Sequence, residues 1–328
     1  MVRALLIGQE QLQSALMGQI SGGRHVHAYL VCGAPGSGKR TLAAWWAQTL
    51  LCLQPGKQGP CGRCGCCVRF ASGNHPDYTL FTADKGKNGV EDIRTLLEDL
   101  PVRPYEGRYK IIVIAQADKL TPQAQNALLK SLEEPPEYAI FILTAGNVQM
   151  ILPTVRSRCE ILHMQRVQPR ILKTVLQERA PQADPLRMEA ACAMADGCIG
   201  KALELVGDDD LFARRERAYR QLCAVTQLKK QDVPGLLTAF KGAREENVQL
   251  LGFWLSMLRD MLCMKIGIQA LENADYAAEL EKNSRPFTTG QLKGMMNTVY
   301  ETQKRIAGNA NAGMAAERML SELLEEMS

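Results

Sequence analysis

The sequence has few aromatic residues, no long apolar run and only a small excess of charge. Phe, Trp and Tyr together account for 5% of the 328 residues, whereas the helix-favouring Ala, Leu and Gln are plentiful. No apolar stretch approaches the ~18 residues that a membrane span needs, and the first residues lack the apolar core of a secretory signal. These absences exclude membrane-spanning and secreted proteins, and we expect a cytoplasmic chain.

The charge balance also limits the function classes. Lys and Arg number 39 and Asp and Glu number 35, which gives a net charge of +4. A protein that binds nucleic acid by itself would concentrate a basic excess in runs, so an independent nucleic-acid-binding module is a disfavoured alternative. Hydrophobic residues make up 46% of the chain, which is enough for a sizeable core and for two or three domains, so disorder is excluded as well.

Short apolar strands and helices alternate in the first half of the sequence. Strands are expected at 28–32, 78–82, 109–115 and 139–144, and helices at 8–20, 39–52 and 122–134. Pro135 and Pro136 end the last of these helices, because proline lacks an amide hydrogen. Buried strands separated by helices predict a parallel α/β sheet.

After about Arg166 the sequence shows only helical patterns. Three short helices are expected at 169–178, 185–195 and 200–206, followed by longer amphipathic helices at 210–226, 245–265 and 289–306. We therefore predict three domains: an α/β domain at 1–165 with a cysteine-rich insertion at about 52–67, a small three-helix domain at 166–206 and a helical domain at 207–328. The acidic stretch 206–210 is the expected hinge.

The segment Gly33-Ala34-Pro35-Gly36-Ser37-Gly38-Lys39 lies between an expected strand and an expected helix, as a phosphate-binding P-loop does. Glycines let successive backbone amides turn toward one anion, and the lysine reaches the outer phosphates. A glycine turn without a ligand is the alternative. The candidate phosphate-loop residues are Gly33, Gly36, Ser37, Gly38, Lys39, Arg40 and Thr41.

Several positions oppose ATP hydrolysis by this chain. Arg40 stands where a Ser or Thr hydroxyl would bind Mg²⁺, and Thr41 is rotated by about 100° around the helix from that position. Ala115 and Gln116 follow the apolar run of the third strand, and neither side chain can ligate a metal ion or accept a proton from water. Asp118 lies further on, with no pattern that places it at the magnesium position. We predict no hydrolysis in cis, while passive nucleotide binding stays open.

The eleven cysteines are about 3% of the chain, far below the density of a disulfide scaffold. In a reducing compartment, clustered cysteines indicate a metal site. Cys61, Cys64 and Cys67 form the pattern C-x-x-C-x-x-C, and Cys52 ends the preceding expected helix. Four thiolates complete a closed tetrahedral site, which predicts one structural zinc ion. The alternatives are Cys66 as a substitute ligand, an iron–sulfur cluster, and reduced cysteines without a metal.

Five short motifs carry a family resemblance. They are His27-Ala28-Tyr29-Leu30, the cysteine insertion, Asn74-His75-Pro76-Asp77, Asn126-Ala127-Leu128-Leu129-Lys130-Ser131-Leu132-Glu133-Glu134-Pro135-Pro136, and Ser157-Arg158-Cys159. With these motifs the chain resembles the delta-prime subunits of the bacterial DNA polymerase III clamp loader, in the AAA+ superfamily. The match is dense from Gly8 to about Cys159 and extends to Val206.

The resemblance implies an AAA+ P-loop domain, a small helical lid and an all-α collar domain that holds subunits together. It implies a non-hydrolysing subunit in a ring with delta and gamma/tau subunits, which loads the sliding clamp onto primed DNA. Arg158, flanked by Ser157 and Cys159, would serve in trans as an arginine finger at a neighbour's ATP site. As part of the polymerase III holoenzyme, the subunit would belong to a DNA-directed DNA polymerase, which is a nucleotidyltransferase.

Two alternatives stand beside this interpretation. An ATP-hydrolysing motor subunit of the gamma/tau kind would share the cysteines and the SRC motif but would keep the magnesium hydroxyl and the acidic pair. Arg158 could instead be a surface arginine paired with an acid, and Arg156 is a second candidate for the finger. Motor subunits present a nucleotide-sensing arginine in the region that corresponds to 197–202. This chain has Gly200 at that position, next to Lys201, and the missing arginine favours the non-hydrolysing subunit.

Overall fold

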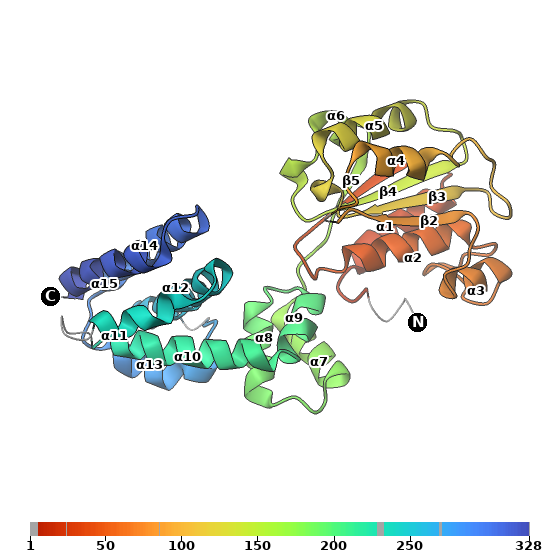
Figure 1. The fold of residues 1–328 in the computed structure, drawn as a ribbon. Coiled ribbons are helices and arrows are strands. Elements are labelled where there is room, and N and C mark those ends of the chain that lie inside the picture. Colours follow the sequence, from red (N-terminus) through yellow and green to blue (C-terminus); the bar gives the residue numbers. More distant parts are fainter. Residues whose placement is uncertain (1–5, 24, 85, 228–232, 269–270, 328) are drawn as a thin grey trace. The chain divides into compact units, whose positions relative to one another are not determined.

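The computed structural model describes residues 6–23, 25–84, 86–227, 233–268 and 271–327 (Figure 1). The chain divides into two compact units. The first contains the chain up to Leu172 together with Gly197–Lys201, and the second contains Lys173–Asp196 and the chain from Ala202 onward. The division into three domains, with boundaries at 165 and 206, stays a prediction.

The first unit is built on five parallel strands in the order β2-β3-β4-β1-β5. Their bounds are Ala28–Cys32 (β1), Tyr78–Thr82 (β2), Lys110–Ala115 (β3), Ala139–Ala145 (β4) and Glu160–His163 (β5). Leu30 in β1 lies opposite Leu143 in β4 and, on the other side, opposite Ile161 in β5. The predicted parallel sheet and its four predicted strands are confirmed.

Several elements have no counterpart among the predicted ones, and in the first unit they include β5, α3 (Gly65–Ala71) and α4 (Val90–Leu97). β5 is a four-residue strand at the sheet edge, and only Leu162 in it is buried. α4 buries only Ile93. Segments this short bury too few side chains to produce a detectable hydrophobic period.

Side chains of the strands alternate between the two faces of the sheet, and each face has its own core. Tyr29 and Ile142 face α1 and α2, whereas Leu30 and Phe141 face α4, α5 and α6. These two groups of helices lie on opposite faces of the sheet (Figure 1). The remaining bounds are Glu10–Ser21 (α1), Lys39–Leu51 (α2), Pro122–Glu133 (α5) and Pro153–Arg156 (α6), with a short η3 at Val148–Met150.

The carboxyl ends of β1, β3 and β4 meet at one edge of the sheet. The P-loop follows β1, the short η2 (Ala117–Lys119) follows β3, and Gly146 follows β4. The Gly33 N–H donates to the Ala145 carbonyl oxygen at 3.2 Å. Because ligands bind at this edge in open α/β sheets, the loops that leave these three strands form the candidate site.

The fully buried Asp77 directly precedes β2 and holds the start of this strand in place. Its carboxylate accepts backbone N–H bonds from Tyr105, Glu106 and Gly107 at 2.6, 2.9 and 2.9 Å. Burial by itself would raise the pKa of Asp77, but the three N–H donors outweigh burial and the pKa lies below its usual value. The NHPD motif thus ties the loop before β3 to the start of β2.

The described residues of the second unit form helices and no strands, as the sequence predicts. The core of this unit joins α10, α12, α14 and α15 through residues such as Leu222, Trp254 and Val299. In the described part of the chain no helix combines the length and apolar character of a membrane span. Helix bounds from α7 onward are Pro169–Arg179 (α7), Pro185–Met194 (α8), Ile199–Val206 (α9), Asp209–Val225 (α10), Val233–Leu237 (α11), Thr238–Lys241 (η5), Arg244–Lys265 (α12), Ala274–Tyr276 (η6), Ala277–Ser284 (α13), Thr289–Ala307 (α14) and Ala312–Met327 (α15).

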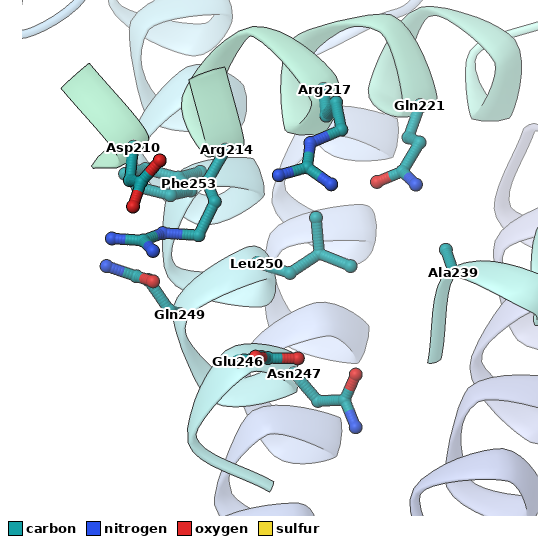
Figure 2. A pocket seen from close by; sticks show the side chains of 10 residues that line it. All are labelled: Asp210, Arg214, Arg217, Gln221, Ala239, Glu246, Asn247, Gln249, Leu250 and Phe253. Carbon is teal, nitrogen blue, oxygen red and sulfur yellow. The ribbon is translucent and has the colours of Figure 1, made fainter. Parts of the chain in front are cut away.

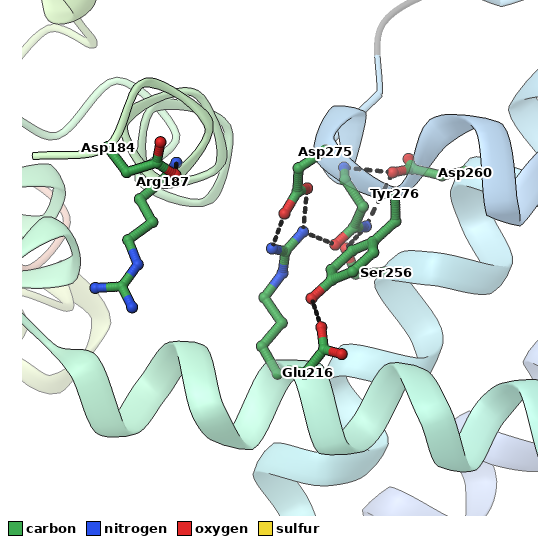
Figure 3. Close-up of polar contacts among 9 residues, drawn as sticks. Asp184, Arg187, Glu216, Ser256, Asp260, Asp275 and Tyr276 are labelled. Carbon is green, nitrogen blue, oxygen red and sulfur yellow. Dashed lines mark hydrogen bonds and ion pairs between the residues drawn. The ribbon is translucent and has the colours of Figure 1, made fainter.

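A buried arginine organises the polar part of this core (Figure 3). Arg215 on α10 is 1% exposed and donates to both carboxylate oxygens of Asp275, at 2.7 and 2.5 Å, and to Asn273 at 2.7 Å. Its guanidinium lies 4.8 Å from the centroid of the Tyr276 ring. The Tyr276 hydroxyl in turn donates to Glu216. Because the buried charge is paired and hydrogen-bonded, the network holds η6 against α10.

Replacing the buried carboxylate with Asp77→Ala should lower the free energy of unfolding by about 3 kcal/mol, since three buried N–H donors lose their acceptor. Urea denaturation at neutral pH measures this difference. The folded pKa lies below the ~3.9 of an unfolded Asp, so the stabilisation is present above that value and is lost as the pH falls through the folded pKa. Asp99→Ala, an exposed change, is the matched control and should leave stability unchanged.

Candidate functional site

The P-loop has the expected position and shape. Gly36 and Gly38 take left-handed φ angles of 74° and 90°, a conformation that side chains rarely adopt, and α2 begins at Lys39. The Lys39 ammonium donates to the carbonyl oxygens of Gly33 and Ala34 at 2.7 and 2.8 Å. Burial lowers the pKa of Lys39, and the nearby Asp118 carboxylate opposes this. The lysine is therefore bonded to its own loop.

The tip of the P-loop is packed against the start of α9, within the first unit. The Gly200 N–H donates to the Gly36 carbonyl oxygen at 2.8 Å. A Cβ added at Gly36 would lie 2.4 Å from the Lys201 nitrogen, and one added at Gly200 would lie 2.9 Å from the Gly36 oxygen. A side chain at either glycine would thus require a backbone shift. Close packing against Gly36 therefore explains why residue 200 is a glycine, at the place where motor subunits present a nucleotide-sensing arginine.

The magnesium positions lack suitable ligands. The Arg40 side chain is exposed, and its charge acts on Tyr78, whose pKa is raised by burial. Ala115 ends β3 in the core, and Gln116 follows with a left-handed φ of 58°. The Gln116 N–H donates to the Thr144 hydroxyl oxygen at 3.0 Å. In these positions the chain offers no carboxylate and no hydroxyl for a metal ion.

Asp118 is a structural residue that the sequence did not locate. It lies in η2, close enough to Lys39 to act on its charge. One oxygen of its carboxylate accepts the N–H groups of Gly146 and Asn147, both at 3.0 Å. Asp118 therefore connects the loops after β3 and β4. No local pattern could reveal this, because the partners are 28 and 29 residues away in the chain.

The SRC motif directly follows the short helix α6, so Arg158 of the motif and Arg156 at the end of α6 are two residues apart. Arg158 forms an ion pair with Glu133 and donates to the Thr154 carbonyl oxygen at 2.8 Å. Arg156 acts electrostatically on Cys32, at the end of β1 beside the P-loop. Of the flanking residues, Ser157 is exposed, and burial raises the pKa of Cys159 to about 12. The Arg158 side chain thus lies at the end of α5.

Four cysteines converge at the end of α2. The Sγ atoms of Cys52, Cys61, Cys64 and Cys67 all lie within 4.8 Å of one another, and two of the pairs are 3.9 Å apart. Backbone N–H groups point at three of the sulfurs, at 3.3 to 3.5 Å. Bonds from the amides of Arg63 and Cys64 lower the pKa of the Cys61 thiol to about 6. This donor set could bind a structural metal ion.

Cys66 is not part of this set. It is buried beside His75 and Glu106 in a separate group. Within that group Glu106 is ion-paired with Arg69, and the His75 Nδ1 accepts the Asp77 N–H. Cys66 therefore does not replace one of the four cysteines, which removes one of the alternatives that the sequence left open.

Known sequences match the chain in both units. Residues 8–168 match the family described as DNA polymerase III, delta subunit, and residues 209–326 match the family of its C-terminal region. The delta-prime subunit of Bacillus subtilis is 28% identical over 97% of this chain and 96% of its own length. That of Escherichia coli is 28% identical over 94% and 91%. The chain belongs to the delta-prime subunits of the DNA polymerase III clamp loader.

Tau and gamma/tau subunits match differently. The tau subunit of Salmonella typhimurium is 29% identical over 90% of this chain, but only 49% of its own length is covered. The delta-prime subunits of Bacillus subtilis and Escherichia coli, by contrast, match over more than nine tenths of their own length. The family resemblance of the five sequence motifs is confirmed, as is the fold class.

The C-terminal region of this delta-prime subunit has a cavity of about 320 Å³ between α10 and α12 (Figure 2). Arg214 and Arg217 line it from α10, and Gln249 and Leu250 line it from α12. Acidic residues, Asp210 and Glu246, are part of the same lining. The lining of this cavity therefore carries charges of both signs.

Replacing two clustered thiols with Cys61→Ser and Cys64→Ser together should remove bound metal and lower the melting temperature, since the loop has little core of its own. Elemental analysis of the purified protein should give one metal equivalent for the native chain and none for the double variant. Cys66→Ser is the matched control and should keep the full equivalent. Metal-free native protein, purified without chelator, would contradict the assignment.

Proposed function

We propose that this clamp-loader subunit is a non-hydrolysing brace. It holds delta and gamma/tau subunits in the ring that loads the sliding clamp onto primed DNA, and it lends Arg158 to a neighbour's ATP site. The observation that carries the proposal is that Arg40, Ala115 and Gln116 around the P-loop supply neither a hydroxyl nor a carboxylate. The small helices and the C-terminal helices would then serve as lid and collar.

The absence of hydrolysis follows from the groups around the P-loop. Hydrolysis needs a hydroxyl and an acid for Mg²⁺ and a base for water, and a base alone contributes about 10²–10⁴-fold. Arg40, Ala115 and Gln116 supply none of these, and the Asp118 carboxylate is bonded to two backbone amides. Nucleotide, if bound, would meet a loop that lacks its metal ligand.

The trans role of Arg158 is supported by its surroundings. Its side chain is 33% exposed, so it is accessible to a neighbouring subunit. A guanidinium stays charged and offers several N–H donors in one plane, which suits charge that develops on a transferred phosphoryl group.

Zinc is the proposed ion of the four-cysteine site. Zn–S bonds of about 2.3 Å in a tetrahedron place the sulfurs about 3.8 Å apart, and two pairs here are 3.9 Å apart. Four thiolates leave no open position, so the ion would be structural. It would fix the insertion to α2, where Gly59 already lies against Trp45.

The second candidate function is an ATP-hydrolysing motor subunit. The favouring observation is the P-loop shape itself, with left-handed Gly36 and Gly38 ahead of α2. The isolated chain, purified free of partner subunits, should nevertheless show no ATP turnover above the blank, and Lys39→Ala should not change that rate. Steady-state phosphate release measures both. Turnover that Lys39→Ala abolishes would favour the motor.

In rings reconstituted with delta and gamma/tau subunits, Arg158→Ala should leave assembly intact. It should lower DNA-stimulated ATP hydrolysis by the amount that the one ATP site served by Arg158 contributes to the total rate. At that site a lost arginine finger costs about 10³–10⁵-fold, while the other sites keep their own fingers. Gel filtration monitors assembly and phosphate release monitors turnover. Arg156→Ala is the matched control, and equal rates for the native and Arg158→Ala rings would remove Arg158 from the mechanism.

A further inference from the structure

The Arg158 guanidinium is held at the carboxyl ends of two helices. Its Nη2 lies 2.5 Å from the Glu133 Oε1, and its Nη1 donates to the Thr154 carbonyl oxygen at 2.8 Å. The same Nη1 lies 3.3 Å from the Ser157 hydroxyl oxygen. Glu133 is the last residue of α5, and Thr154 belongs to α6. Three contacts on the chain's own surface therefore restrict the arginine.

The positions of these groups are fixed by packing and by the chain itself. Thr121 caps the start of α5 and two prolines after Glu134 prevent its continuation, so Glu133 has a defined place. Leu132 of α5 and Val155 of α6 are buried in one hydrophobic core. The helix ends that carry Glu133 and Thr154 are thus held together, and both present negative charge to the guanidinium.

We infer that Glu133 is a positioning residue for Arg158. It holds the guanidinium in one orientation, and the Nε–H and the unused Nη hydrogens remain available to a neighbour's phosphate. The inference rests on the proposed trans role of Arg158. Glu133 does not touch the nucleotide, and it acts only through the arginine.

The exposure of the pair sets the size of the effect. Glu133 and Arg158 side chains are 47% and 33% exposed, so the ion pair is screened and restrains the arginine without trapping it. Pairs of this kind contribute an amount equivalent to about a twofold to fivefold change in rate. Replacing Glu133 is therefore expected to lower the rate of ATP hydrolysis much less than replacing Arg158 itself.

The test compares rings reconstituted with delta and gamma/tau subunits and containing native chain, Glu133→Gln, Glu133→Asp, Arg158→Ala, or Glu133→Gln combined with Arg158→Ala. Glu133→Gln should lower the DNA-stimulated kcat at the affected site about twofold to fivefold with the KM for ATP unchanged. Glu133→Asp keeps the charge and should lie between the native and Gln variants. Glu134→Gln, the neighbouring acid, is the matched control and should behave as native.

The double variant separates positioning from a general structural role. If Glu133 acts through the arginine, Glu133→Gln should have no further effect once Arg158 is Ala. An unchanged or raised kcat for Glu133→Gln, beside a lowered kcat for Arg158→Ala, would overturn the inference and leave the proposed function intact. An effect that persists in the double variant, or a change in KM alone, would overturn it too. A native rate for Arg158→Ala would overturn the proposed function and this inference together.

Discussion

Parallel pairing of β1, β3 and β4 forces the chain to leave the sheet at one edge, and the first unit is arranged around that edge. The three connections that leave the sheet there are brought together by backbone hydrogen bonds of buried strands. Because these three loops lie side by side, they fix three local features: the P-loop conformation, the left-handed turn at Gln116, and the hydrogen bond from the Gly146 N–H to Asp118. Without the sheet register these groups would have no common location.

Three polar groups at this edge are bonded within the protein, whereas the buried Ser37 hydroxyl has no hydrogen-bond partner. The Lys39 ammonium uses loop carbonyls, the Asp118 carboxylate uses two amides, and the Gly36 carbonyl uses the Gly200 amide. The phosphate loop thus keeps its left-handed glycines, while Arg40, Ala115 and Gln116 beside it offer neither a hydroxyl nor a carboxylate.

Segments with little core of their own are fixed by concentrated polar or sulfur chemistry. The cysteine insertion converges on four thiols, and Asp77 holds the loop before β3 with three amide bonds. In the second unit Arg215 plays the comparable part through Asp275 and Asn273. In each place polar or sulfur groups supply the stabilisation that a short segment cannot gain by burying apolar side chains.

The sequence by itself determined four of the five sheet strands, the P-loop, the helical second half and the four clustered cysteines. These are local signals: buried runs, glycine spacing and the C-x-x-C repeat act over a few residues. Only the tertiary structure decided that Asp118 joins two loops, that Cys66 lies apart from the four thiols, and that Arg158 is held by Glu133. Those facts depend on contacts between residues far apart in the chain, which packing of the sheet and its helices brings together and no local pattern encodes.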